Sequence, residues 1–244
     1  IKIKEKNIPL ILLNARITKK SFKKWSKVLS FAKKIFNEFD LCLGQNNKTC
    51  NYLKILGAKN IKKIGNLKFS QSRSELKNKQ NTKIKKILRN KKIIFSAIST
   101  HKGEELFCGK VHANLKKKYK NIISIIIPRH VHRAHEIKQE LNANGLRVHL
   151  HTSNKTINSK TDIYLVDTFG ETKSFLKLSK IAFMGKSIYA KGGQNPLEAA
   201  RLGNRIIHGP NIENFIEVYD FLKKQEISTK IKSYKGLENL VFKF

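Results

Sequence analysis

From residue 92 onward, short apolar segments alternate with amphipathic ones. Strands are expected at residues 93–98, 122–127, 146–150, 162–166, 181–184 and 205–207, and helices at 103–119, 132–144, 171–178, 196–202 and 211–224. Continuous apolar strands that alternate with helices are typical of a parallel sheet covered on both faces. Such sheets bind ligands in a crevice at the carboxyl ends of their strands. The pattern therefore predicts an α/β fold with functional residues in the loops after residues 98, 127, 166 and 184.

The first 70 residues show a shorter version of the same pattern. We expect strands at residues 9–14, 40–43 and 61–64, an amphipathic stretch at 21–39 and a helix at 48–56. Residues 70–92 are polar and lysine-rich without a clear strand, which is typical of a linker with a solvated helix. The sequence therefore predicts three parts, at residues 1–70, 71–91 and 92–244.

The charge of the chain is unusual. Lys and Arg number 51 against 17 Asp and Glu, and the formal net charge of +34 attracts phosphate on nucleic acid, anionic lipid or a nucleotide sugar. The excess is mostly lysine spread along the chain, and it accompanies frequent Ile and Asn. All three residue types have A/T-rich codons, so a biased genome produces such a surface without selection for binding. Net charge therefore does not choose between functions.

The cysteines and the apolar runs indicate the kind of compartment in which the protein folds. Three cysteines without C-x-x-C spacing favour a reducing compartment and argue against a disulfide or zinc framework. No apolar run approaches the roughly 18 residues of a membrane-spanning helix, and no signal peptide is recognisable. Because the chain begins with Ile rather than Met, we expect an N-terminal portion to be missing.

The first two strand-end loops carry groups that bind anions. Residues 99–105 (STHKGEE) combine hydroxyls, a His and a Gly at a strand-to-helix turn, which suits either an anion or a simple helix cap. Arg129 stands just beyond the strand at 122–127, where its guanidinium can reach a phosphate or a carboxylate. The offsets of His130, His132 and His135 do not place three imidazoles on one helical face, so we expect no metal site.

The later loops are rich in glycine. In residues 167–171 (DTFGE), Gly170 lets a ligand approach the backbone and Phe169 can pack on a base, although a plain tight turn is the simpler interpretation. Residues 192–198 (GGQNPLE) predict a capped helix with Asn195 as N-cap, Pro196 first and Glu198 third. Glu198 can accept hydrogen bonds from ribose hydroxyls. This segment is the strongest signal in the chain, and it indicates a nucleotide.

Seven segments, taken in order, resemble the bacterial 3-deoxy-D-manno-octulosonic acid (Kdo) transferases over nearly the whole chain. They are LNAR (13–16), GNLKF (65–69), STHKGEE (99–105), IIIPRH (125–130), DTFGE (167–171), GGQNPLE (192–198) and GPNIENF (209–215). The resemblance implies the α/β GT-B glycosyltransferase architecture, in which two Rossmann-like domains face a cleft. Residues 1–70 are then expected to be the C-terminal part of the N-terminal, acceptor domain, residues 71–91 the linker, and residues 92–244 the CMP-sugar-binding domain.

The resemblance also implies an activity. Such enzymes transfer Kdo from CMP-Kdo to the lipid A precursor, lipid IVA, in lipopolysaccharide core biosynthesis, with inversion and without a metal or other cofactor. They work at the cytoplasmic face of the inner membrane, so the expected partners are CMP-Kdo, the lipid acceptor and an anionic membrane surface, with no specific nucleic acid. The membrane anchor and general-base Glu of the family match nothing in this chain. We therefore expect it to bind the donor without transferring the sugar.

The family's motifs carry specific roles over to this sequence. Contacts with CMP are implied for Pro128, Arg129, Phe169, Gly170, Glu171, Asn195, Pro196, Leu197 and Glu198. Lys68, in the GNLK segment, is similar to a residue that stabilises the departing negative charge in the transition state, as a fixed cation can. The sequence departs from the family's usual residues at Lys102 (Glu), His132 (an acid), Lys186 (Gly) and Gln194 (His).

Two other interpretations remain open at this point. The first is a nucleic-acid-binding protein, which charge alone supports and which leaves the strand-end loops without a role. The second is another GT-B transferase that uses a UDP-sugar, because a glycine-rich loop before a capped helix is common among nucleotide folds.

Overall fold

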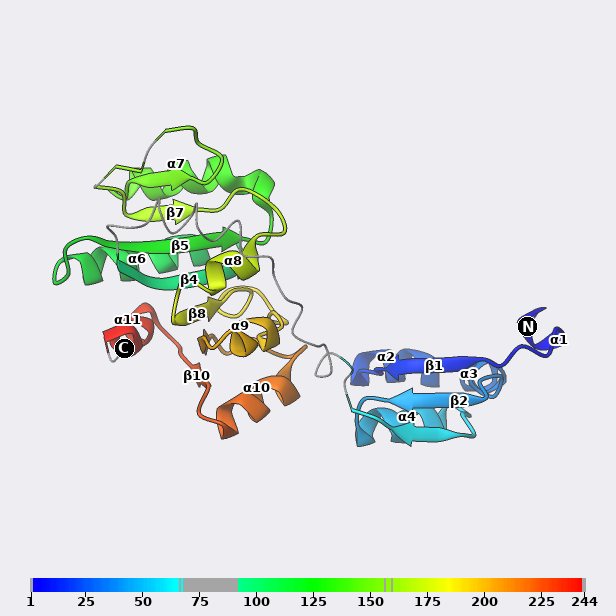
Figure 1. Ribbon diagram of the computed structural model, residues 1–244. Helices are drawn as coiled ribbons and strands as arrows, with labels where there is room; N and C mark the ends of the chain where they lie inside the picture. The colour runs from blue at the N-terminus through cyan, green and yellow to red at the C-terminus, as the bar shows by residue number, and fades with distance from the viewer. Residues whose placement is uncertain (1, 66, 68–91, 156, 159, 243–244) are drawn as a thin grey trace. The chain divides into compact units, whose positions relative to one another are not determined.

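The computed structural model describes residues 2–65, 67, 92–155, 157–158 and 160–242. The chain separates into two units, Ile1–Ser74 and Glu75–Phe244 (Figure 1). The predicted linker at residues 71–91 lies outside the described residues, so the boundaries at 70 and 92 stay predictions. Among the described helices, none combines the length and the apolar composition needed to cross a membrane.

Unit 1 is a small parallel α/β unit. Its strands, in the order β1-β2-β3, are Ile11–Ala15, Leu41–Gly44 and Ile61–Lys63. Its helices are α1 (Lys2–Glu5), α2 (Lys19–Ser26), α3 (Leu29–Phe36) and α4 (Asn47–Ile55). The three expected strands and the helix expected at 48–56 are confirmed to within two residues. The amphipathic stretch at 21–39 forms two helices rather than one, because Val28 leaves the helical region with φ −125 and ψ 47.

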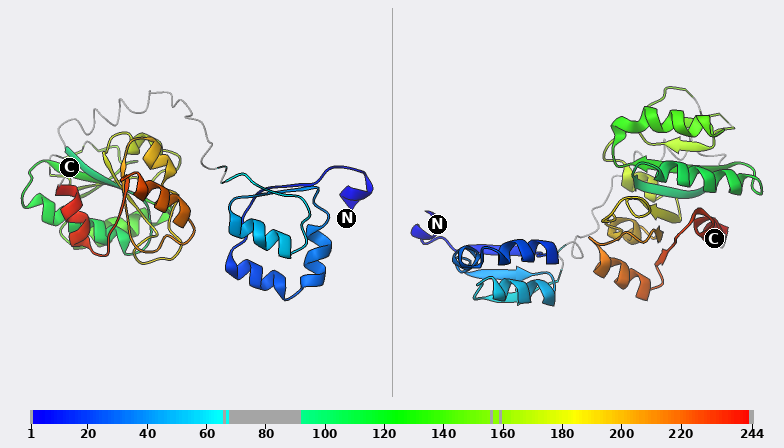
Figure 2. Two further views of the ribbon diagram at one scale, coloured as in Figure 1. Left: turned by 90° about the horizontal axis from the view of Figure 1, so that it is seen from below. Right: turned by 180° about the vertical axis from the view of Figure 1, so that it is seen from behind.

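Helices α2, α3 and α4 cover one face of the sheet of unit 1 (Figure 2). Cys42 of β2 and Leu53 of α4 are fully buried, and Leu12 of β1 packs against the same cluster. Ile11 and Leu13, which point the other way, are exposed. This alternation within β1 follows from the period of two of strand side chains.

Unit 2 contains a seven-stranded parallel sheet in the order β10-β9-β8-β4-β5-β7-β6. The strands are β4 (Lys92–Thr100), β5 (Ile122–Pro128), β6 (Val148–Leu150), β7 (Ile163–Leu165), β8 (Ile181–Met184), β9 (Arg205–His208) and β10 (Ser228–Lys230). On one side of β4 lie β5, β7 and β6, with β7 inserted between β5 and the edge strand β6, and the chain then crosses over to place β8 on the other side of β4. This reversal next to β4 is the kind of switch point at which parallel sheets bind ligands.

Helices cover both faces of this sheet, as predicted (Figure 2). On one face lie α6 (Glu104–Lys116), α7 (Ala134–Ala143) and α11 (Tyr234–Phe242); on the other lie α8 (Thr172–Leu176), α9 (Leu197–Arg201) and α10 (Ile216–Lys224). Within β5, Ile126 enters the first apolar layer while Ile125 and Ile127 enter the second. Because both faces are covered, the strand is apolar at almost every position.

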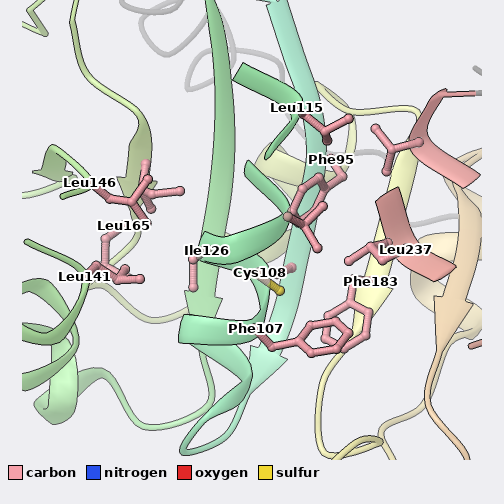
Figure 3. Packing of buried hydrophobic residues seen from close by; sticks show 14 of the residues in the cluster. Phe95, Phe107, Cys108, Leu115, Ile126, Leu141, Leu146, Leu165, Phe183 and Leu237 are labelled. Atoms are coloured by element: carbon pink, nitrogen blue, oxygen red, sulfur yellow. The ribbon is translucent and has the colours of Figure 1, made fainter. Parts of the chain in front are cut away.

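Figure 3 shows the apolar layer on the α6 face. Phe107 of α6 stacks on Phe183 of β8 with ring centroids 5.7 Å apart, and Leu237 of α11 lies close to this pair. The sequence did not predict α11 or β10, because one follows a run of polar residues and the other is only three residues long. The two apolar layers fix the sheet and leave its carboxyl edge to carry the loops.

Candidate functional site

The four loops predicted to carry function follow strands that are neighbours in the sheet. The order β8-β4-β5-β7 places their carboxyl ends side by side, since all four strands are parallel. Backbone bonds tie these ends together: Gly185 N donates to Ile98 O at 2.8 Å, and Arg129 N donates to Thr100 O at 3.0 Å. One edge of the sheet therefore gathers the residues that the sequence had marked separately.

The buried carboxylate of Glu104 holds two of these loops together. Its Oε1 accepts hydrogen bonds from the N–H groups of Ser187 at 2.9 Å and Ile188 at 3.0 Å. Its Oε2 accepts from the N–H groups of Lys186 at 2.7 Å and His101 at 2.9 Å. Glu104 is fully buried in the first turn of α6, where the helix dipole also favours a carboxylate. The sequence indicated only an anion site or a helix cap in this segment, whereas these four hydrogen bonds show that Glu104 holds the loops after β4 and β8 together.

The backbones of the loops after β4 and β8 approach each other closely. A Cβ atom on Gly185 would lie 2.3 Å from Ser99 O, so a side chain has no space there. Lys186 has φ +57, in the left-handed region that favours glycine. This conformation gives a physical reason for the Gly that is usual at this position in the resembled family.

Arg129 follows β5 directly and its side chain is exposed. It forms no ion pair within the part of the chain that the structure describes, so its guanidinium is available to an anion. Nearby, the rings of His101 and His130 meet edge to face at 5.5 Å, and His101 Nε2 lies 3.5 Å from Gln194 Nε2. Burial lowers the pKa of His101 despite the opposing charge of Glu104, so its imidazole is neutral near pH 7. The edge thus places the guanidinium of Arg129 beside the polar side chains of His101 and Gln194.

The DTFGE segment comes from the loop after β7. Phe169 is 73% exposed, and a Cβ atom on Gly170, whose φ is +84, would meet nothing within 4 Å. Glu171 Oε2 accepts a hydrogen bond from Thr168 Oγ1 and lies 3.0 Å from His151 Nε2. An exposed ring beside an open glycine meets the steric needs of a base, and its contact with CMP stays a prediction.

The GGQNPLE segment requires one correction. Helix α9 starts at Leu197 with Pro196 as its N-cap, so the prediction of Asn195 as the N-cap is wrong by one residue. Asn195 Oδ1 accepts from Leu197 N at 3.2 Å, which makes an Asx turn before the helix begins. The side chains of Pro196 and Leu197 are buried, and their contacts with CMP stay a prediction. Glu198 is exposed and pairs with Lys173 Nζ at 3.2 Å.

The same segment is held in place from behind. Gly192 N donates to Glu213 Oε2 at 2.7 Å. Tyr219 Oη, at the end of a buried side chain, donates to Gln194 O at 3.0 Å, and burial raises the pKa of this phenol. These contacts come from α10 and the loop before it, and nothing in the sequence pattern indicated them.

Two further expectations concern Lys68 and a metal ion. Lys68, the predicted stabiliser of the leaving charge, lies outside the described residues. Where the structure does describe the chain, no group of three or more His, Cys, Asp or Glu side chains is arranged to hold a metal ion.

A second buried polar cluster surrounds Asp162, which precedes β7 and so lies at the opposite edge of the sheet. Its carboxylate is bound by Lys116 Nζ and by Arg147 Nε, the latter at 3.2 Å, with His112 Nε2 at 3.6 Å. Although burial raises the pKa of Asp162, hydrogen bonds from His112, Lys116 and Arg147 hold it well below its ordinary value. Because this cluster lies away from the carboxyl edge, we assign it to stability rather than to binding.

Similarity to known proteins agrees with this arrangement. The sequence model of the family described as 3-deoxy-D-manno-octulosonic-acid transferase (kdotransferase) matches residues 1–71. The 3-deoxy-D-manno-octulosonic acid transferase of Rickettsia bellii is 32% identical over 236 residues, which cover 97% of this chain and 56% of the relative. That of Haemophilus influenzae is 27% identical over 219 residues, covering 89% and 51%. The chain therefore spans about half the length of the curated relatives it matches.

Solved structures share the fold. The C-terminal CMP-Kdo binding domain of WaaA from Acinetobacter baumannii superposes with a TM-score of 0.60 at 26% identity, covering 68% of this chain and 86% of that domain. Anabaena HepE in complex with UDP gives a TM-score of 0.52 at 11% identity over 99% of this chain and 64% of that one, which shows the fold alone. The expected GT-B class, with Rossmann-like parallel sheets, is confirmed.

The motifs, the parallel sheets and these relatives agree: the chain belongs to the 3-deoxy-D-manno-octulosonic acid (Kdo) transferase family of glycosyltransferases.

Proposed function

We propose that the protein is a glycosyltransferase that uses CMP-Kdo in lipopolysaccharide biosynthesis, and that unit 2 binds this donor. The observation that carries the proposal is the likeness to the CMP-Kdo binding domain from Acinetobacter baumannii, of which the chain covers 86% at 26% identity. The Kdo transferases of Rickettsia bellii and Haemophilus influenzae support the same donor.

The carboxyl edge supplies the groups that CMP requires. The phosphate is an anion, and Arg129 offers it an exposed guanidinium that forms no ion pair with any described residue. Guanidinium groups bind phosphate oxygens through charge-assisted hydrogen bonds. Phe169 offers an exposed ring for the base. Glu171 and Glu198 offer carboxylate oxygens to hydroxyl groups, and Asn195 turns the chain so that the backbone before α9 can approach the ligand.

In the proposed reaction, a hydroxyl oxygen of the lipid A precursor, lipid IVA, attacks the anomeric carbon of Kdo. The bond from that carbon to the CMP phosphate oxygen breaks, the configuration inverts, and the hydroxyl proton passes to a general base. Because the general-base Glu of the family matches nothing in these 244 residues, we expect them alone to bind the donor without transferring the sugar. CMP leaves as a phosphate monoester, so negative charge grows on the departing oxygen. A fixed cation stabilises such charge, and we propose Lys68 for this role.

We further propose that the reaction takes place at the cytoplasmic face of the inner membrane. The acceptor is a lipid, and the formal net charge of +34 is compatible with an anionic membrane surface. Binding of the purified chain to anionic vesicles, compared with neutral vesicles at the same salt concentration, tests this part of the proposal.

Calorimetric titration of CMP into the chain and two variants tests donor binding. Arg129→Ala is expected to weaken CMP binding by about tenfold or more, the cost of one hydrogen bond to a charged group. Arg205→Ala is the matched control, because Arg205 begins β9 at the opposite edge and donates to Glu226 O. Equal CMP affinities for the Arg129 variant and the natural chain would reject the proposed site. Tight, salt-sensitive RNA binding in addition would favour a nucleic-acid-binding protein.

A UDP-sugar transferase is the second candidate, because HepE with bound UDP shares the fold. The proposal predicts that CMP bound to the chain is not displaced by an excess of UDP or UDP-glucose. If UDP or UDP-glucose displaced bound CMP at a concentration equal to that of CMP, the donor would be a UDP-sugar and the proposal of CMP-Kdo would be rejected.

A further inference from the structure

His151 connects the candidate site to the buried core. It follows β6 directly, and its Nε2 lies 3.0 Å from Glu171 Oε2. Its Nδ1 lies 2.7 Å from the hydroxyl of Tyr164, a fully buried residue of β7. The His151 ring also meets the ring of Phe175 edge to face, at 5.4 Å. The imidazole of His151 therefore links Tyr164, a buried residue of the sheet, to the carboxylate of Glu171.

The hydrogens along this chain of contacts have a defined order. Burial raises the pKa of Tyr164 to about 12, and the nearby charges of Glu171 and Asp167 act in the same direction, so the phenol stays protonated. An ionised carboxylate can only accept hydrogen bonds, so Nε2 of His151 must donate to Glu171. With the ring hydrogen on Nε2, Nδ1 of the imidazole accepts from the Tyr164 hydroxyl 2.7 Å away. Tyr164 thereby fixes the tautomer that holds Glu171.

These contacts occupy only one oxygen of Glu171. Both His151 Nε2 and Thr168 Oγ1 reach Oε2. Among the described residues Oε1 has no hydrogen-bond partner, and the side chain of Glu171 is 18% exposed. Exposed Phe169 and the open position at Gly170 stand next to it in the chain. The second oxygen is therefore held in a fixed orientation and free to accept a hydrogen from a ligand.

We infer that His151 is a positioning residue for donor binding: together with Tyr164 it fixes Glu171 so that Oε1 accepts a hydrogen bond from the cytidine nucleotide. The inference rests on the proposed CMP site and adds residues that no family motif in this chain marks. The donor on the ligand is either a ribose hydroxyl or the cytosine amino group, because both present an N–H or O–H to a carboxylate.

Calorimetry with three His variants tests the inference. His151→Ala is expected to weaken CMP binding about tenfold, as for the loss of one hydrogen bond to a charged group. His151→Gln, which places an amide N–H near the position of Nε2, is expected to restore affinity to within about threefold of the natural chain. His149→Ala is the matched control, because His149 stacks on the same Tyr164 ring at 5.6 Å and belongs to β6. It should leave CMP affinity unchanged.

A double-mutant cycle separates positioning from a general structural effect. His151→Ala should have no further effect on CMP binding when Glu171 is already Ala. Tyr164→Phe, which keeps the buried ring, should weaken CMP binding less than His151→Ala and needs no refolding of the loop. Comparison of CMP with deoxy-CMP and UMP identifies the hydrogen-bond donor on the ligand. Deoxy-CMP lacks a ribose hydroxyl and UMP lacks the amino group of the base. The analogue whose affinity differs from that of CMP in the natural chain, but not in Glu171→Ala, lacks the group that donates to Glu171.

The outcomes distinguish a failure of the proposed CMP site from a failure of the proposed role of His151. If the natural chain binds no CMP, the proposed function fails and this inference fails with it. If the natural chain binds CMP and His151→Ala binds it equally well, the inference alone is overturned. An equal loss in His151→Ala and His149→Ala, or a full additional loss in the Glu171→Ala background, also overturns it, because the effect then does not pass through Glu171.

Discussion

Glu104→Gln is the substitution whose cost follows most directly from the structure. The carboxylate of Glu104 is fully buried and accepts four backbone N–H groups, two on each oxygen. An amide of the same shape keeps one acceptor oxygen and replaces the other by an NH2 group. Two buried N–H donors then face a donor rather than an acceptor.

The expected loss is large compared with the stability of a domain. Each buried donor left without an acceptor costs about 1–3 kcal/mol, so two of them lower the free energy of unfolding of unit 2 by about 2–6 kcal/mol. The free energy of unfolding of natural domains is about 5–15 kcal/mol, so the variant would lose a substantial fraction of its stability. The loops after β4 and β8 should also lose their fixed spacing, and CMP affinity should fall with the stability.

Urea unfolding followed by two signals measures this effect. Far-ultraviolet circular dichroism reports both units, while the fluorescence of Trp25, the single tryptophan, reports unit 1 alone. Glu104→Gln should shift the dichroism transition and leave the Trp25 transition in place. The control is Glu136→Gln in α7, an exposed carboxylate that is bound by Arg133 Nε at 3.4 Å rather than by a set of buried backbone amides. A shift of less than about 0.5 kcal/mol for Glu104→Gln, or equal shifts for both variants, would refute the reasoning.

Three further results are expected. The pKa of the Asp162 carboxyl is about 4 in the unfolded chain and lower in the folded one, so its contribution to stability is present above pH about 4 and is lost as the pH falls toward the folded pKa. Asp162→Asn should therefore lower the free energy of unfolding by about 3 kcal/mol at pH 7. Urea titrations at several pH values should also show that the stability of this variant depends less on acid. Gly185→Ala should lower the thermal midpoint, because its Cβ would lie 2.3 Å from a backbone oxygen. Gly236→Ala, in α11 with its nearest contact at 3.4 Å, should leave the midpoint unchanged or raise it slightly, because alanine stabilises a helix by up to about 1 kcal/mol relative to glycine. Lys186→Gly should be tolerated and stabilise by at most about 1 kcal/mol, because it relieves a positive φ.

The fold of unit 2 could be predicted because its strands are unusually explicit. Residues 122–127 are apolar at nearly every position, and the structure finds β5 at Ile122–Pro128 with both faces covered. The parallel order then determines which loops share an edge, so the position of Arg129 followed from the strand that precedes it. Short elements such as β10 carry too few residues to show any period.

The candidate site could be predicted only where one segment carries the signal. Asn195 was predicted to be the N-cap of a helix, but the N-cap is Pro196, one residue later, and Asn195 Oδ1 accepts from Leu197 N in an Asx turn. Contacts between distant segments left no trace in the sequence. Glu104 reaches backbone groups 82–84 residues away, and His151 reaches Glu171 from the end of another strand. Such pairs depend on strand order, which no local pattern encodes.

The account depends on several strand-end loops forming one site for CMP, and amide resonances of the labelled chain test this most directly. On titration with CMP, the resonances of Arg129, Gly170 and Leu197 should move together with a single dissociation constant. Those of Asn121 and Lys180, which precede β5 and β8 at the opposite edge, should stay in place. If the three edge resonances do not move, or move with unrelated constants while exposed lysines respond instead, the claim of a single CMP site is contradicted.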